Sequence, residues 1–215
     1  MPGPTNEPAH EPVHEPATRD PFGEDTVVLD DGRTVTIRPV NAADADALIA
    51  MHEQHSPRTV RRRFFSSMPH LPADQARRFA DVDGVSRVAL VAQAPSGELV
   101  AVARYDCLPA QAGPAGPAGV AARIAAEVAI VVTDDYQHHG LGVAILTRLV
   151  AVARHLGVDH FTADVLMDNR PMLATFRDAG LTYQAHTEAG VVHLELPLSG
   201  AVVDDDPGSP AASPG

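Results

Sequence analysis

One uninterrupted succession of segments, between residues 122 and 157, most constrains what this chain can fold into. The stretch "ARIAAEVAIVV" is rich in β-branched residues and predicts a long strand. A short polar loop follows, and residues 140–157 then repeat apolar side chains at helical spacing. A strand that runs through a glycine-containing loop into an amphipathic helix needs a sheet with a helix packed on it. The succession therefore favours an α/β fold.

Gly140 and Gly142 stand where this helix should begin. The first turn of a helix has backbone N–H groups without intrahelical partners, and the helix dipole adds partial positive charge there. Because glycine has no Cβ, phosphate oxygens could approach these amides closely. The adjacent His138 and His139 suggest a metal instead, but no further ligands stand nearby at suitable spacing. We therefore expect a phosphate or pyrophosphate site at this loop, and no metal.

The rest of the chain alternates between strands and helices. Asp31-Gly32 predicts the turn of a hairpin over residues 26–40. Asn41, Ser56-Pro57 and Pro72 predict the starts of three helices. We expect a mixed sheet with helices on both faces. Its other elements are predicted to be strands at 88–94, 99–108 and 160–166, a helix at 169–180 and a closing hairpin at 181–198.

Both ends of the chain differ in composition from its middle. Residues 1–24 repeat Glu-Pro, and residues 200–215 are rich in Asp, Pro and Gly, so both predict disordered tails around one domain at 25–199. The first tail contains a literal H-E-x-x-H at residues 10–14. A zinc site of that type needs both histidines on a helix, and the surrounding prolines exclude one. A further Pro- and Gly-rich segment, residues 109–119, predicts a flexible loop.

The composition also limits the partners. The formal charge of −12 argues against a nucleic-acid binder and favours cationic partners such as amines. Cys107 is the one cysteine, so no intrachain disulfide can form. The sequence shows no signal-peptide pattern, and its longest apolar run, residues 143–153, is too short to span a bilayer. We expect a cytoplasmic protein without a membrane partner, whose oligomeric state the sequence does not indicate.

Two blocks and one shorter segment resemble a known family. Residues 127–158 resemble the central block of the GNAT acetyltransferases, whose signature Q/R-x-x-G-x-G/A is matched in full by "QHHGLG", 137–142. Residues 165–183 resemble the block that follows it. "SPRTVRRRFF", 56–65, is similar to a segment of the Pat-type bacterial protein lysine acetyltransferases. The resemblance covers about residues 35–198 and implies the GNAT fold, with a mixed, mostly antiparallel central sheet and helices on both faces.

The resemblance further implies acetyl-CoA as cosubstrate, without a metal. Its pyrophosphate would bind the backbone N–H groups of the glycine loop. The preceding strand would splay from its neighbour and pair with the pantetheine arm, and one of its N–H groups would polarise the thioester carbonyl. Asn169 would contact the cofactor arm. The implied cofactor-binding residues are Ile130, Val131, Val132, Gln137, His138, His139, Gly140, Leu141, Gly142, Val143 and Asn169.

Acetyl transfer to an amine needs a base, because a lysine ammonium keeps its proton at pH 7. Glu127 interrupts an otherwise apolar strand, so burial there should raise the pKa of its carboxyl toward neutrality. The alternative is an ordinary strand residue that faces solvent. Asp164 is the second candidate, because several family members carry a catalytic Glu at the matching strand position. Phe176 stands where many members carry a Tyr that protonates the leaving thiolate, so that general acid is missing.

Other side chains receive plainer expectations. Cys107, in an apolar strand, is expected to be a core thiol and not an acyl carrier. The Arg61–Arg63 run predicts a helix with some arginines facing solvent and with the following Phe64 and Phe65 packed inward. An arginine near the cofactor, such as Arg148 or Arg170, could meet its 3′-phosphate.

Three functions remain open at the level of sequence. The resemblance favours an N-acetyltransferase that acts on lysine side chains of proteins, by direct attack in a ternary complex. The first alternative is an acetyltransferase for a small amine, such as an aminoglycoside or polyamine. The second is an acyl-CoA-binding module without catalysis.

Overall fold

A computed structural model describes residues 20–109 and 124–198 of the chain. The tails expected at 1–24 and 200–215 lie outside the described residues, apart from residues 20–24. The H-E-x-x-H repeat and nearly all of the Pro- and Gly-rich loop lie outside them as well. Within the described part, no helix is both long and apolar enough to cross a bilayer.

The described strands form a single eight-stranded sheet in the order β1-β2-β3-β4-β5-β6-β8-β7. Every neighbouring pair is antiparallel except β5 and β6, which are parallel. The expected mixed, mostly antiparallel sheet is therefore confirmed. The strands are β1 (Asp25–Val28), β2 (Thr34–Pro39), β3 (Arg87–Gln93), β4 (Leu99–Cys107), β5 (Ala125–Val132), β6 (His160–Leu166), β7 (Gln184–Glu188) and β8 (Val191–Pro197).

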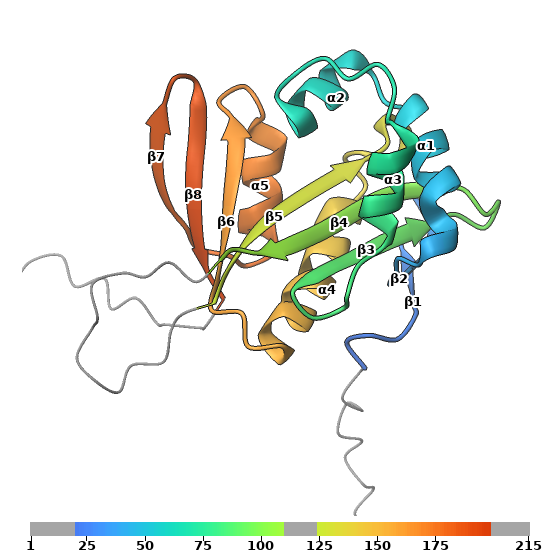
Figure 1. Ribbon diagram of the computed structural model, residues 1–215, viewed down its shortest axis with the longest axis horizontal. Coiled ribbons are helices and arrows are strands. Elements are labelled where there is room, and N and C mark those ends of the chain that lie inside the picture. The colour runs from blue at the N-terminus through green and yellow to red at the C-terminus, as the bar shows by residue number, and fades with distance from the viewer. Residues whose placement is uncertain (1–19, 110–123, 199–215) are drawn as a thin grey trace, which may run out of the picture.

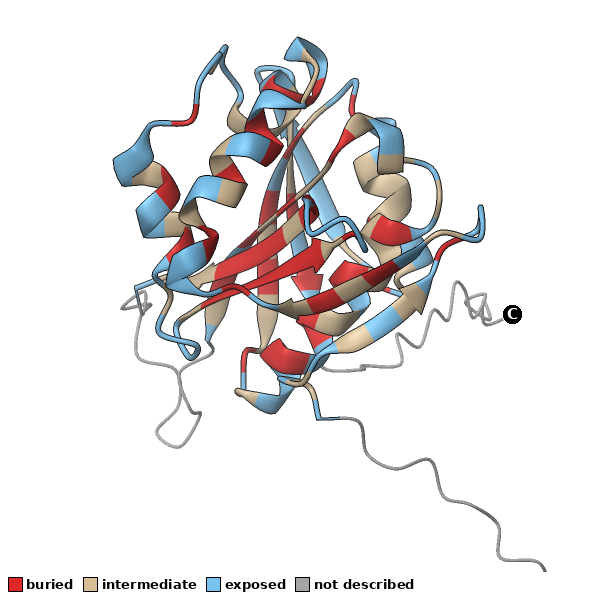
Figure 2. Ribbon diagram, turned by 90° about the vertical axis from the view of Figure 1, so that its right-hand side faces the viewer, coloured by how far each residue is buried: buried red, intermediate tan, exposed pale blue. Residues whose placement is uncertain are grey.

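Helices cover both faces of this sheet (Figure 1). On one face α1 and α3 pack against each other, and α1 also packs on β4. On the other face α4 packs on β3, β4, β5 and α5. Figure 2 shows the buried residues concentrated where these layers meet. The helices are α1 (Ala45–Glu53), α2 (Pro57–Phe64), α3 (Ala73–Ala80), α4 (Leu141–His155) and α5 (Arg170–Asp178), with short 3-10 turns at Ala42–Asp44 and Asp134–Tyr136.

Local chemistry explains where the helices before β3 begin and end. Asn41 forms a capping box with Asp44, and the Ser56 hydroxyl accepts a hydrogen bond from the Thr59 amide, so both predicted helix starts are confirmed.

The α2 helix ends because Phe65 adopts a left-handed conformation with φ of 60°. The expected inward packing of Phe65 is wrong, since this side chain is 42% exposed. Phe64 does pack inward, edge-on to the His52 ring.

Candidate active site

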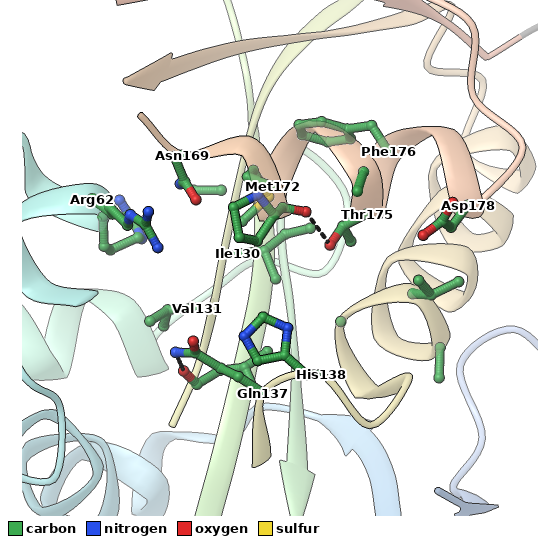
Figure 3. Close-up of a pocket in the computed structure, with 18 of the residues that line it drawn as sticks. Arg62, Ile130, Val131, Gln137, His138, Asn169, Met172, Thr175, Phe176 and Asp178 are labelled. Carbon is green, nitrogen blue, oxygen red and sulfur yellow. Dashed lines mark hydrogen bonds between the residues drawn. The ribbon is translucent and has the colours of Figure 1, made fainter. Parts of the chain in front are cut away.

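The sheet opens between its two parallel strands. Residues 125–127 of β5 pair with residues 160–162 of β6, and no pairing joins the two strands beyond that point. Among the described strands, the rest of β5 therefore has no partner on its β6 side, while it stays paired with β4 on the other. A cavity of about 760 Å³ lies there, lined by β5, β6, α2, α5 and the loop before α4. Figure 3 labels side chains of α2, β5, α5 and the loop before α4 around it.

The loop that enters α4 has an unusual backbone. His138 and Gly140 adopt φ values of 64° and 82°, in the left-handed region. Left-handed residues in alternation with ordinary ones turn successive N–H groups toward one point, which is a common way of binding anions. The helix then begins at Leu141, so the positive end of its dipole faces the same point. The loop thus offers a cluster of amides at one end of the cavity.

A second set of contacts holds this loop in place. The Gln137 side-chain amide donates to the Val132 carbonyl and to the Asp134 carboxylate, both at 3.0 Å. Asp134 in turn accepts hydrogen bonds from the Ser56 amide and the Thr59 hydroxyl at the start of α2. Burial acts to raise the pKa of Asp134, but these hydrogen bonds outweigh it and hold the pKa below its ordinary value. Gln137 lines the cavity, but its side-chain amide is hydrogen-bonded within the protein and holds the loop in position.

The adjacent histidines behave differently from each other. His138 is exposed, and its side chain is among those drawn around the cavity in Figure 3. His139 is turned toward the β1–β2 turn, where its Nδ1 lies 3.3 Å from the Asp31 carboxylate. The His139 carbonyl also accepts the Asp30 amide. These contacts join the loop to the β1–β2 turn.

Most of the other predicted cofactor residues also line the cavity. Asn169 is buried at the N-cap position of α5, and its side chain makes no capping hydrogen bond, so the amide is available to a ligand. Leu141 is the exception, because its side chain is fully buried in the core and only its backbone can face a ligand. Lining residues from the predicted set are Ile130, Val131, Val132, Gln137, His138, His139, Gly140, Gly142, Val143 and Asn169.

Glu127 lines the cavity, but the apolar surroundings expected for it are wrong. Its side chain is exposed, because strand alternation points Ala126 and Val128 into the α4 core and Glu127 to the opposite face. Directly across the strands lies Asp106, which receives two hydrogen bonds from Arg104. The sequence pattern alone did not show that Glu127 lies on the face of β5 that borders the cavity and remains exposed there.

Asp164 shares that face. Glu127 pairs with Thr162, and Asp164 follows two residues later on β6, so both carboxylates point to the same side of the sheet. Asp164 is exposed, lines the cavity, and accepts a hydrogen bond from His193 Nδ1 at 2.7 Å. The structure thus brings the two candidate bases to one side of one cavity.

Two arginines that sequence reasoning left without a role belong to the site. Arg62 reaches from α2 to the Asp168 carbonyl at 2.8 Å, and its Nε is buried without a partner. Arg63 is close enough to Glu127 to interact with its charge, while burial and the neighbouring Arg104 lower the pKa of Arg63 to about 10. The helix start at Ser56-Pro57 could be predicted from the sequence. Which arginines of α2 face the cavity depends on how α2 packs over β5, and the sequence does not show that packing.

The other suggested arginines do not line the cavity. Arg148 donates to the carbonyls of Asp20, Pro21 and Gly23, so it anchors the segment before β1. Arg170 is exposed at the first position of α5. Arg148 is thus engaged in structural contacts, whereas Arg170 lies between the cavity-lining residues Asn169 and Pro171, so contact of Arg170 with the 3′-phosphate stays a prediction.

Two further residues bear on the chemistry. Phe176 is buried and lines the cavity without offering a proton. Cys107 packs against the core, and burial raises the pKa of its thiol, which disfavours a thiolate nucleophile.

Comparison with known proteins identifies the family to which this fold and this cavity belong. The family model described as "Acetyltransferase (GNAT) domain" matches residues 34–182. The crystal structure of the GNAT domain of S. lividans PAT superposes with a TM-score of 0.71 and 41% identity, over 81% of this chain and 96% of that one. A GNAT phosphinothricin acetyltransferase from Sinorhizobium meliloti, in complex with acetyl-CoA, shares the fold at a TM-score of 0.59 and 21% identity, over 76% of this chain and 88% of that one.

A curated relative is much longer than the region it shares with this chain. Acetyltransferase Pat from Mycolicibacterium smegmatis is 38% identical over 71 residues, which are 33% of this chain and 21% of that protein.

Proposed function

We propose that this chain, which belongs to the GNAT acetyltransferase family, is an N-acetyltransferase that uses acetyl-CoA as cosubstrate and acetylates lysine side chains of proteins. In this proposal the loop at 138–143 binds the pyrophosphate through backbone amides. Residues 130–132 of β5 receive the pantetheine arm, and the Asn169 amide contacts it. The non-catalytic acyl-CoA-binding module is the second alternative, and it would bind CoA without releasing CoA from acetyl-CoA against any amine.

The observation that carries the proposal is the cavity between β5 and β6. One end offers the amide cluster before α4, and the exposed carboxylates of Glu127 and Asp164 line the same cavity. An extended ligand along β5 would have its anionic part at the amides and its thioester near the carboxylates. A donor and an acceptor could then meet in one ternary complex, and direct transfer would follow without an acyl-enzyme.

In the proposed reaction Glu127 takes a proton from the lysine ammonium, directly or through a water. The neutral amine attacks the thioester carbonyl, and a β5 amide donates to the developing oxyanion. The attacking nitrogen gives up its second proton to solvent, and collapse of the intermediate forms the amide bond and releases CoA thiolate, which takes up a proton from solvent. Phe176 supplies none, and a thiolate leaves readily enough to need no dedicated acid.

Exposure of both carboxylates supports a protein acceptor. A lysine on the surface of a folded protein can reach a base that lies on an open face, whereas a deeply enclosed base would admit only small amines. The chain's net charge of −12 would also attract a basic partner. A small amine remains the alternative acceptor, and the experiments below separate the two.

The role of Glu127 is tested by the isosteric variant Glu127→Gln. We expect kcat to fall by about 10²-fold or more, because the proton acceptor is lost, while acetyl-CoA affinity stays unchanged. Asp164→Asn is the matched comparison on the neighbouring strand, with a smaller expected loss. If Glu127→Gln turns over as fast as the parent and Asp164→Asn does not, Asp164 is the base.

The acceptor class is tested with labelled acetyl-CoA. The protein contains no lysine, so every acetyl-lysine detected after incubation with a cell lysate belongs to an acceptor and not to the enzyme. We expect acetyl-lysine on lysate proteins with the parent and not with Glu127→Gln. Release of CoA with polyamines or aminoglycosides, without any acetylated protein, would select the small-amine alternative.

A further inference from the structure

The hairpin at the far edge of the sheet gathers three potential metal ligands. Register places His186 of β7 directly opposite His193 of β8, with their rings stacked at 4.7 Å between centroids. Glu188 follows His186 by two residues and so points to the same face. The ligand atoms of these three side chains all lie within 4.8 Å of one another. Figure 1 shows β7, β8 and β6 side by side at this edge.

Asp164 adds an outer partner to this group. It lies opposite His193 on the other side of β8 and accepts a hydrogen bond from His193 Nδ1 at 2.7 Å. That contact fixes the imidazole ring and leaves Nε2 available. A carboxylate that holds the second nitrogen of a histidine is the arrangement commonly found behind metal-binding histidines.

The donor set identifies the class of ion. Two imidazoles and one carboxylate suit Zn²⁺, which accepts three protein ligands and a water in tetrahedral geometry. Mg²⁺ and Ca²⁺ prefer sites made of oxygen. His186 and Glu188 are exposed and His193 is half-buried, so an ion can reach all three from solvent.

We propose that His186, Glu188 and His193 form a Zn²⁺ site, with Asp164 supporting His193. Acetyl transfer needs no metal, and the three proposed ligands lie outside the cavity lining, but Asp164 belongs to both sites because it also lines the cavity as the second candidate base. A bound ion joins β7 to β8. All five residues of β7 are exposed, so this edge strand has little burial of its own, and a metal crosslink would secure it.

The proposal is tested by calorimetric titration of ZnCl₂ into the full-length protein. Because His10 and His14 lie outside the described residues and could bind zinc themselves, the reference protein is His10→Ala/His14→Ala. We expect one site in this reference and at least a 10-fold loss of affinity on adding His186→Ala or His193→Ala. Asp164→Asn should weaken binding by about 10-fold or more through loss of the outer partner.

The control is the exposed His70→Ala, which should bind zinc as the reference does. A second readout, the thermal midpoint, should rise with zinc in the reference and not in His186→Ala. Unchanged zinc affinity in His186→Ala would overturn the site. So would a reference protein that binds no zinc at 100 µM, because its dissociation constant would then be weaker than about 10⁻⁴ M. Neither readout depends on the acceptor or on Glu127.

Discussion

Gly140 and Gly142 stand two residues apart but meet different constraints. Gly140 has φ of 82°, a conformation that costs any other residue energy, and an added Cβ would lie 3.2 Å from the Asp30 carboxylate. Gly142 is in ordinary helical backbone, and an added Cβ would lie in normal contact with Thr175 at 3.5 Å. The first glycine shapes the loop, and the second leaves room for a ligand.

Alanine at these two positions should therefore have opposite effects on stability. Gly140→Ala should lower the free energy of unfolding by about 1–2 kcal/mol, because it strains the backbone. Gly142→Ala should raise that free energy by up to about 1 kcal/mol, because alanine favours the helix. Urea unfolding of both variants checks this, and a stable Gly140→Ala would contradict the assigned backbone.

The sequence anticipated the residues of the site better than their surroundings. The signature at 137–142 located the loop, and Glu127 and Asp164 do line one cavity. The exposure of Glu127 was missed, because strand alternation separates two faces without saying which parts of them a helix covers. His186 was missed for a related reason. His186 lies next to His193 because of the register of the hairpin, whereas a pattern of adjacent or closely spaced histidines in the sequence does not reveal such a pair.

At the scale of elements, α2 is tied to the site loop through one carboxylate. Asp134, in the 3-10 turn before Gln137, accepts from the Ser56 amide at 2.6 Å and from the Thr59 hydroxyl. It therefore caps α2 from 78 residues away in the chain. Since α2 carries Arg62 and Arg63, this bond also positions one wall of the cavity.

Asp134→Asn should loosen α2. The neutral amide accepts more weakly and puts a donor where an acceptor is needed, so we expect a loss of about 1–2 kcal/mol in stability. Hydrogen exchange should show faster exchange in residues 57–64 than in α4. Asp135→Asn, which changes an exposed neighbour, is the control and should exchange like the parent. Equal protection of α2 in both variants would show that Asp134 does not hold it.

Element boundaries were predicted closely where local chemistry sets them, as at Ser56-Pro57 and in the strand at 160–166. The separation of β5 from β6 could not be read from their residues, because the local pattern of neither strand says how far their pairing extends. It became an expectation only through the family resemblance. Pairing over just three residues is a property of long-range packing and not of local propensity.

At the scale of the whole molecule, a buried ion pair joins the sheet to the helical layer over it. Arg38 of β2 makes two hydrogen bonds of 2.8 Å to Asp44, which also closes the capping box before α1. Burial acts to raise the pKa of Asp44, but Arg38 and the Asn41 amide outweigh it and lower the pKa. A carboxyl with a lowered folded-state pKa stabilises the fold above its unfolded pKa, and this contribution is lost as the pH falls through the folded value.

Asp44→Asn should lower the free energy of unfolding at pH 7 by about 2–3 kcal/mol, since it leaves Arg38 without its charged partner. The difference from the parent should begin to shrink as the pH falls below the unfolded pKa of an Asp, about 4, and should be lost as the pH falls through the lower folded pKa of Asp44. Urea unfolding at pH 7, 5 and 3 measures this. Asp46→Asn, an exposed acid in the first turn of α1, serves as control. A difference that stays constant with pH would contradict the assignment.

The central claim is that backbone amides before α4 bind the pyrophosphate of acetyl-CoA. Calorimetric titration of acetyl-CoA into the parent and into Gly142→Leu tests it most directly. We expect one site in the parent and an affinity at least 10-fold lower in the variant, about 1.4 kcal/mol, because the side chain fills the approach to the amides. No heat with the parent, or equal affinity in a folded Gly142→Leu, would contradict the account.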